Sequence, residues 1–354
     1  MSWAYRPANQ FAQFAAHWQR LNADGPNSPL LEPDFVTPLL SEFASGNELL
    51  ACYEQAGQIQ AMTIVRPRRT SEWETFQPSQ APIGLWVQSS TLDQSKLLRE
   101  MMSTLPGLVL TLGVTQQDPA LSTRPTDSPL LHTMDYIRTA HIPIVGSFDD
   151  YWNARGKNLR TNLKKQRAKL LKDDVPTRME ISRTPDQMAT AVADYGRLES
   201  AGWKAQGGTA IHPDNAQGRF YLKMLEAFGR RDAASVYRYW FGEQLVAMDF
   251  CIEGNGSIIV LKTTYDESVP NSLSPTLLMR EEAARQIFTE AKFAKLEFYG
   301  KVMDWHTRWT DQIRTLYHIT GYRWAVLPAL RRLASKPLNL VARLRTRTTG
   351  TVTE

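Results

Sequence analysis

The stretch that decides the fold is YDESVPNSLSPTLLMREEAARQIF, residues 265–288. A strand is expected to end at Tyr265, a polar loop follows, and Ser274 with Pro275 marks the start of a helix. The first backbone N–H groups of a helix lack internal partners, and the helix dipole adds partial positive charge there. This helix start is therefore a candidate anion site, although a well-capped structural helix accounts for the same residues.

Three predicted antiparallel strands lead into this loop. Turns at 242–243 and 254–256 separate apolar segments at Ala234–Phe241, 245–253 and Ser257–Tyr265, as is typical of hairpins. The surrounding segments predict, in chain order, a strand at 178–183, helices at 186–203 and 214–229, the helix from Pro275 to about 291, a strand at 295–299, a helix at 305–320 and a strand at 322–327.

The first half of the chain repeats this order in a weaker form. Its patterns predict helices at 11–21, 34–43 and 93–104, and strands at 48–54, 58–66, 82–88 and 108–115. A length of 354 residues also exceeds what one hydrophobic core usually covers. We therefore expect a tandem α/β (α+β) architecture with domains at 1–146 and 177–327, a basic connecting helix within 147–176 and a basic tail at 328–354.

Two basic segments flank the second predicted domain. Eight basic residues and no acidic residue fall between Arg155 and Lys172, with leucines at helical spacing. This amphipathic helix is either a solvated bridge or a contact for an anionic ligand, and no recognition-helix motif supports sequence-specific nucleic-acid binding. The tail beyond residue 327 fits either a docked segment or a peripheral membrane contact.

Composition narrows the class of protein. The net charge is +5, and 42% hydrophobic with 22% charged residues is ordinary for a globular protein. Cys52 and Cys251 each lie in an apolar run, which predicts buried free thiols and a reducing compartment. The N-terminus lacks a signal-peptide pattern, and the run at 105–114 is too short to span a bilayer. We expect a cytoplasmic protein without a metal site, because the histidines show no metal-ligand spacing. The oligomeric state stays open.

The order of strands, loop and helix resembles the GNAT acyltransferase fold. Residues 159–309 are similar to the CelD/BcsL-type acetyltransferases, which are associated with cellulose and exopolysaccharide and are related to the Fem-type tandem-GNAT transferases. The motifs that carry the resemblance are RTNLKKQRAKL, LESAGWKAQGG, FYLKML, LVAMDFCI, TTYDESVPNSLSPTLL and FYGKVMDWHTRW. Thr276 stands where the family usually has glycine, and His306 where it usually has lysine. The resemblance implies two tandem GNAT-like domains, each a mixed, mostly antiparallel sheet flanked by helices.

The same resemblance implies acetyl-CoA, or another acyl-CoA, as co-substrate, and no metal. The residues that would hold it lie at the strand end and in the following loop: Thr264, Tyr265, Ser272, Leu273, Ser274, Thr276 and Leu277. A backbone amide of that strand would stabilise the oxyanion.

Candidate catalytic and acceptor-binding residues surround the loop. His306 is the first candidate for the base, because a histidine in the first turn of a helix is expected to be neutral. Asp266 and Glu267, at the mouth of the loop, are the alternatives. The candidate acceptor-binding residues are Trp203, Lys204, Tyr299 and Trp305. Packing, turn formation or solvation accounts for each of these side chains equally well.

The expected function is acyl-CoA-dependent N- or O-acetyl transfer, without a covalent enzyme intermediate, to a small amine or to a saccharide or polysaccharide precursor. One alternative is Fem-like transfer from an aminoacyl-tRNA, with the basic helix as the RNA contact. Another is a non-catalytic GNAT-like binding module in exopolysaccharide assembly, which the departures at Thr276 and His306 favour.

Overall fold

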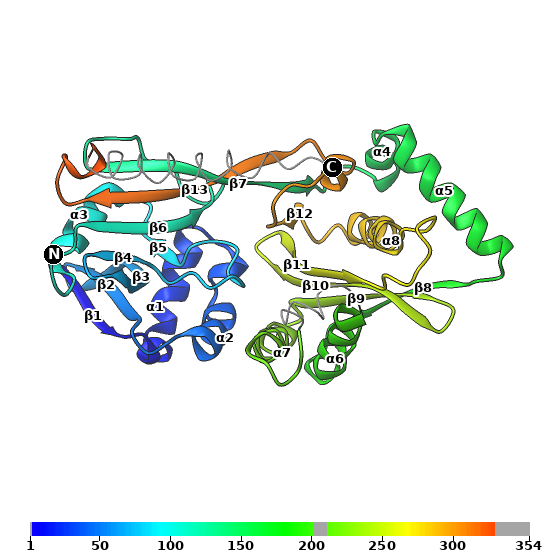
Figure 1. The fold of residues 1–354 in the computed structure, drawn as a ribbon, viewed down its shortest axis with the longest axis horizontal. Coiled ribbons are helices and arrows are strands. Elements are labelled where there is room, and N and C mark those ends of the chain that lie inside the picture. Colours follow the sequence, from blue (N-terminus) through cyan, green and yellow to red (C-terminus); the bar gives the residue numbers. More distant parts are fainter. Residues whose placement is uncertain (1, 202–210, 330–354) are drawn as a thin grey trace, which may run out of the picture.

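The computed structural model describes residues 2–201 and 211–329, and their strands form one 13-stranded sheet that runs through both halves of the chain (Figure 1). The strand order is β1-β2-β3-β4-β6-β13-β7-β12-β11-β10-β9-β8, with β5 paired to β3. Helices cover both faces. The predicted mixed α/β architecture, a large sheet flanked by helices, is confirmed.

The first half contains seven of these strands. They are β1 (Ser2–Pro7), β2 (Leu49–Gln55), β3 (Gln58–Arg69), β4 (Glu72–Thr75), β5 (Trp86–Gln88), β6 (Thr111–Gln117) and β7 (Leu131–Pro143). Its helices are α1 (Phe11–Asp24), α2 (Pro33–Phe43) and α3 (Gln94–Thr104), with short 3-10 turns at Ala8–Gln10 and Pro29–Leu31.

The second half follows α4 (Phe148–Asn153) and the basic helix α5 (Lys157–Lys172). Its strands are β8 (Thr177–Ser182), β9 (Ala234–Phe241), β10 (Gln244–Gly254), β11 (Ser257–Tyr265), β12 (Lys295–Phe298) and β13 (Ile313–Tyr322). Its helices are α6 (Pro185–Ala201), α7 (Ala216–Gly229), α8 (Pro275–Glu290) and the short α9 (Asp304–Thr307).

The two halves repeat one order of elements and exchange their last strands. In each, an edge strand and two helices precede three strands, a helix and a further strand, and the pairs β4–β6 and β11–β12 are parallel. The final strand of the first half, β7, pairs with β12 of the second. The final strand of the second half, β13, pairs with β6 of the first, and β7 and β13 pair with each other. The halves are thereby joined through backbone hydrogen bonds.

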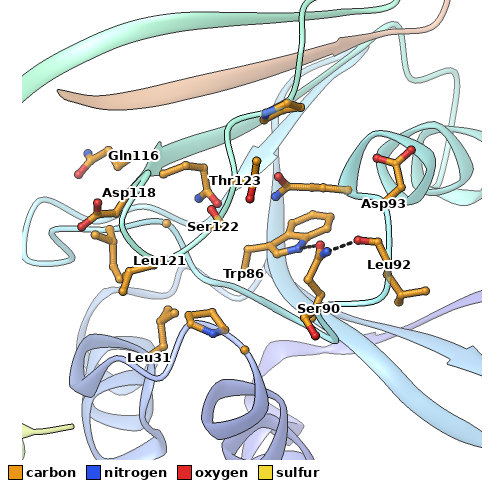
Figure 2. A pocket seen from close by; sticks show the side chains of 18 of the residues that line it. Leu31, Trp86, Ser90, Leu92, Asp93, Gln116, Asp118, Leu121, Ser122 and Thr123 are labelled. Atoms are coloured by element: carbon orange, nitrogen blue, oxygen red, sulfur yellow. Dashed lines mark hydrogen bonds between the residues drawn. The ribbon is translucent and has the colours of Figure 1, made fainter. Parts of the chain in front are cut away.

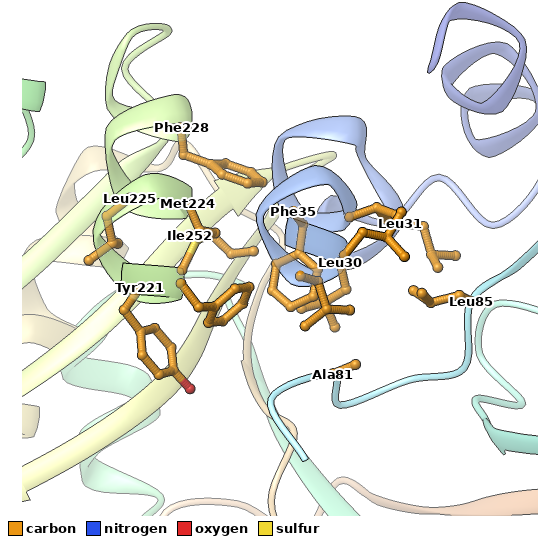
Figure 3. Close-up of a cluster of buried hydrophobic side chains, with 14 of the residues drawn as sticks. Leu30, Leu31, Phe35, Ala81, Leu85, Tyr221, Met224, Leu225, Phe228 and Ile252 are labelled. Atoms are coloured by element: carbon orange, nitrogen blue, oxygen red, sulfur yellow. The ribbon is translucent and has the colours of Figure 1, made fainter. Parts of the chain in front are cut away.

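A shared hydrophobic core also joins the halves. Figure 3 shows Phe35 and Leu30 of the first half facing Met224 and Phe228 of α7. Here α2 packs against α7, and the rings of Phe35 and Phe220 meet edge to face at 5.5 Å between centroids. Side chains from both halves are fully buried in this cluster, so separating the halves would expose them to water.

Two predicted elements near the C-terminus are wrong. The helix expected at 305–320 is only the four residues of α9, followed by β13, and the strand expected at 322–327 is absent from the described structure. Burial alternates along residues 317–321, but the register shift between Thr315 and Tyr317 interrupts the pattern over the rest of β13. Long-range pairing therefore decided its conformation. The strands β1, β4 and β7 were not predicted, and the other expected elements form within a few residues of their predicted ends.

Cys52 and Cys251 are buried free thiols, as predicted. Among the described residues, no helix is both long and apolar enough to cross a membrane. Trp203, Lys204 and residues 330–354 of the basic tail lie outside the described residues.

Candidate functional site

An opening between β11 and β12 forms the centre of the candidate site. The two strands pair only over Ser257–Val260 and Lys295–Phe298, and within the described chain no strand continues β12 alongside the rest of β11. The Asp266 N–H donates to the Val246 carbonyl at 2.9 Å. Alternation along an antiparallel ladder then turns the backbone groups of Thr263 and Tyr265 away from β10, toward the opening. Backbone donors and acceptors are thus available to a ligand there.

The loop before α8 lies against the basic helix α5. Ser274 holds the N-cap position but its side chain makes no capping bond, and its N–H donates to Gln166 Oε1 at 2.8 Å. Lys169 Nζ donates to Ser272 Oγ at 2.9 Å. Pro275 has no N–H, and the Leu277 N–H donates to the Ser274 carbonyl. The amide of Thr276 therefore remains as the helix-start donor, and α5 supplies a cation beside it.

These features fit an anionic co-substrate. The loop combines a helix N-terminus with a lysine, and both favour a negatively charged group. The Ser274 N–H donates to Gln166 Oε1, and a phosphate would present an acceptor oxygen of the same kind. Of the predicted cofactor-binding residues, Ser272, Leu273, Ser274, Thr276 and Leu277 lie together here, and Thr264 and Tyr265 end the adjacent strand.

A buried ion pair lies beneath the opening. Arg280 donates to Asp249 Oδ2 at 2.9 Å, and Thr263 donates to Asp249 Oδ1 at 2.6 Å. The guanidinium carbon of Arg280 also lies 4.5 Å from the Trp305 ring centroid, and Trp305 stacks on His306 at 3.5 Å. Trp305 is therefore sandwiched between two side chains, which is a packing role.

His306 is buried and neutral. Burial and the positive charge of Arg280 lower its pKa from 6.5 to about 4. Its Nδ1 accepts the Met303 N–H at 2.9 Å, so the proton of the neutral ring is assigned to Nε2. In this arrangement the Nδ1 lone pair of His306 is occupied by the Met303 N–H, and the Nε2–H is the group that the ring can offer to a ligand. Neutrality was predicted, but its cause is burial, because α9 spans four residues and contributes little dipole.

We expect this histidine to make stability depend on pH. Its folded pKa lies below its unfolded value, so the unfolded state binds more protons between about pH 6.5 and 4, and the free energy of unfolding falls as pH drops through that window. The loss attributable to His306 is about 2–3 kcal/mol. In urea unfolding, the stability difference between wild type and His306→Gln should narrow from pH 7 to pH 4.5. A difference that stays constant would contradict the buried neutral ring.

The carboxylates at the loop mouth behave as turn residues. Burial opposes ionisation of Asp266, but hydrogen bonds from Ser268 and Gln244 outweigh it and lower its pKa. The Ser268 N–H and Gln244 Nε2 each donate to this carboxylate at 2.8 Å. A carboxylate held ionised in this way is a weak base. Glu267 is exposed on the same loop.

Tyr299 lies on the opposite face of the sheet from α8 and joins a network that sequence reasoning missed. Its hydroxyl donates to Asp118 Oδ2 at 2.8 Å, and burial together with this carboxylate raises the pKa of Tyr299 well above its usual value. Arg314 donates to both oxygens of Asp118, at 2.8 and 2.7 Å, and lies 2.9 Å from Glu297. Lys295 lies 2.8 Å from the other Glu297 oxygen. Asp118 and Tyr299 are 181 residues apart, so no local signal could have paired them.

Comparison with known proteins agrees with this geometry. Residues 157–307 match the sequence model of a family described as an acetyltransferase (GNAT) domain. The similarity to this family therefore covers the segment from the start of α5 to α9. No curated protein matches the chain.

Solved structures share its fold over nearly its whole length. FemX superposes with a TM-score of 0.54 at 9% identity, covering 94% of this chain and 99% of FemX. L-PGS from Bacillus licheniformis superposes with a TM-score of 0.54 at 10% identity, covering 91% of this chain and 96% of that one. At such identities the likeness shows the fold alone. Among the described residues, no cluster of three or more histidine, cysteine or acidic side chains could hold a metal ion.

Proposed function

We propose that the protein is an acyl-CoA-dependent N- or O-acyltransferase, of the acetyltransferase type, acting on a saccharide or polysaccharide precursor or another small amine. The observation that carries the proposal is the open edge of β11 beside the start of α8, within the segment that matches the GNAT family. The co-substrate diphosphate would lie at Thr276 and Lys169, and the thioester would lie along the edge of β11.

Direct transfer needs little from the protein beyond positioning. The acceptor nitrogen or oxygen attacks the thioester carbonyl carbon, the C–S bond breaks, and the acceptor proton leaves to solvent or to the departing thiolate. Backbone N–H groups of Thr263 and Tyr265 face the opening and would stabilise the oxyanion. His306 stays the proposed general base, a role that requires its Nδ1 to be released from the Met303 N–H, and Asp266 and Glu267 stay the alternative bases.

Calorimetric titration with acetyl-CoA tests the donor site. We expect Thr276→Glu to weaken the binding of acetyl-CoA there. A carboxylate in the first turn of α8 stabilises the helix through its dipole but repels the diphosphate. Affinity for acetyl-CoA should fall at least tenfold while thermal stability is kept or slightly raised. Thr276→Gln, of the same size without the charge, is the matched control and should bind within about threefold of wild type. Absence of wild-type binding at millimolar acetyl-CoA would refute the proposed function.

A second candidate is Fem-like transfer from an aminoacyl-tRNA, and the exposed cations of α5 favour it. Lys157, Lys164, Lys165, Lys169 and Lys172 are exposed on this helix. Binding to a polyanion through them would weaken steeply with salt. Charged tRNA that binds with such a dependence and supports turnover, in the absence of acetyl-CoA turnover, would select this candidate.

A further inference from the structure

The first half of the chain encloses a cavity of about 380 Å³ that the donor site does not use. Its walls come from the end of α1, from β5, from the start of α3 and from the loop after β6. Figure 2 shows Trp86 between Leu92 and Asp93 on one side and the segment Leu121–Thr123 on the other. The volume is within the range of about 300–1,000 Å³ that small-molecule sites occupy.

The cavity combines one aromatic ring with amides and hydroxyls. Trp86 is held in place by Trp3, at 6.0 Å between centroids, and by the hydrogen bond from its Nε1 to Gln88 Oε1 at 2.7 Å. Gln94 is 9% exposed, and among the described residues none hydrogen bonds with its side chain. The amide of Gln94 still reaches solvent, so it is available to hydrogen bond with a ligand in the cavity. Ser90, Gln116 and Ser122 add further polar groups.

The charge of the cavity excludes anions. Asp24, Asp93 and Asp118 line it, and none of its described lining residues is lysine, arginine or histidine. From outside the cavity, Arg314 neutralises Asp118 and Arg20 lies 3.9 Å from Asp24, which leaves Asp93 as the carboxylate in the wall without a cation near it among the described residues. A phosphate or carboxylate would meet like charge, whereas a neutral or ammonium-bearing ligand would not.

One hydrogen bond links the wall of the cavity to the end of β12. Asp118, in its wall, accepts the hydroxyl of Tyr299, the residue directly after β12. Leu296 and Phe298 of β12 pack under α8, and alternation along the strand places Tyr299 on the other face. The wall of the cavity is thus tied by one hydrogen bond to the strand beside the opening, on the face opposite α8.

We propose that this cavity binds a saccharide unit, uncharged or carrying an amine, through apolar contact with Trp86 and Leu121 and hydrogen bonds to Gln94 and the neighbouring hydroxyls. Its role as the acceptor site rests on the proposed transferase function. The binding of a saccharide to the cavity does not rest on that function, because the cavity lies outside the donor loop.

Calorimetry and ligand-observed NMR on the full chain, without acyl donor, test the proposal. Cellobiose and glucosamine should bind with millimolar or better affinity, and glucose 6-phosphate at least tenfold more weakly. Gln94→Ala should lower the affinity for cellobiose roughly three- to tenfold through loss of one or two hydrogen bonds. Gln19→Ala, an exposed glutamine on α1, is the matched control and should change nothing.

An added positive charge sharpens the test. Thr123→Lys places an ammonium at the exposed rim and should raise the affinity for glucose 6-phosphate relative to cellobiose. Absence of saccharide binding to wild type, or binding unaffected by Gln94→Ala, overturns the proposal. Thr276→Glu separates the two hypotheses, because it should abolish acetyl-CoA binding and leave cellobiose binding intact. Saccharide binding without acetyl-CoA binding would refute the transferase and keep the cavity site.

Discussion

Replacement of Arg314 by methionine is expected to lower the free energy of unfolding by about 3–5 kcal/mol. The guanidinium bonds both oxygens of Asp118 and lies 2.9 Å from Glu297, and the two carboxylate side chains are only 0% and 1% exposed. Removing the guanidinium leaves Asp118 without a cation and Glu297 with only Lys295, at 2.8 Å, and both carboxylates are too deeply buried for water to take its place. Urea unfolding at pH 7 measures the effect.

The pH dependence of that deficit has a definite sign. In wild type, burial opposes ionisation of Asp118, but Arg314 outweighs it and lowers the pKa, so this stabilisation is present above about pH 4 and is lost as pH falls through the lower folded pKa. Without Arg314 the buried carboxyl prefers its protonated form, so stability is lost as pH rises. The deficit of the variant should therefore shrink from pH 7 toward pH 4.

An exposed ion pair provides the control. Arg285→Met removes a partner of Asp149 at 3.1 Å, where the side chains are 52% and 74% exposed, and should cost less than about 1 kcal/mol. A second comparison is Arg314→Met combined with Asp118→Asn, which removes a charge along with its partner and should recover part of the loss. Equal effects of Arg314→Met and Arg285→Met would contradict the buried network.

The second large effect concerns the folding of the two halves of the chain when they are separated. Expressed separately, residues 1–146 and 147–354 are each expected to fail to fold cooperatively, although the second piece contains the whole segment matched to the GNAT family. Separation removes the pairing of β12 with β7 and of β13 with β6, and exposes the shared cluster around Phe35 and Phe220. Gel filtration and thermal unfolding by circular dichroism measure this.

Co-expression of the two pieces is the matched control, because it restores all of these contacts without a covalent link. It should yield a one-to-one complex with cooperative unfolding. A cooperative transition in residues 147–354 alone would show that the exchanged strands are dispensable, and would support the predicted domain boundaries as independent units.

Local patterns were enough to predict much of the fold. The strand β11 was predicted with its observed ends, and α8 begins at Pro275 as expected, because proline and the preceding polar loop restrict the backbone locally. The hairpin strands around Gly242 and Gly256 followed from turn chemistry, since both glycines have positive φ, at 57° and 69°. Segment 313–322 was mispredicted because an irregularity between Thr315 and Tyr317 interrupts its alternation and its partner strands β6 and β7 are distant in sequence.

The residues of the candidate site likewise fall into those that local sequence could predict and those that it could not. The loop from Ser272 to Leu277 is contiguous in sequence, so the resemblance of its motif was enough to predict an anion site there. The partners of Tyr299 and His306 come from distant positions, and burial, which no sequence pattern measures, keeps His306 neutral. Gln166, which occupies the Ser274 N–H, lies 108 residues away on α5.

The sequence by itself determined the longer helices, the hairpin strands β9 to β11, the helix start at Pro275 and the two buried thiols, because each depends mainly on neighbours within a few residues. Only the tertiary structure decided the exchange of β7 and β13, the Asp118–Arg314–Glu297 network and the cavity beside Trp86. The strand exchange and the ion-pair network join segments more than a hundred residues apart, and the cavity joins separate segments between residues 24 and 125. The free energy that fixes these features comes from burial and pairing between those segments.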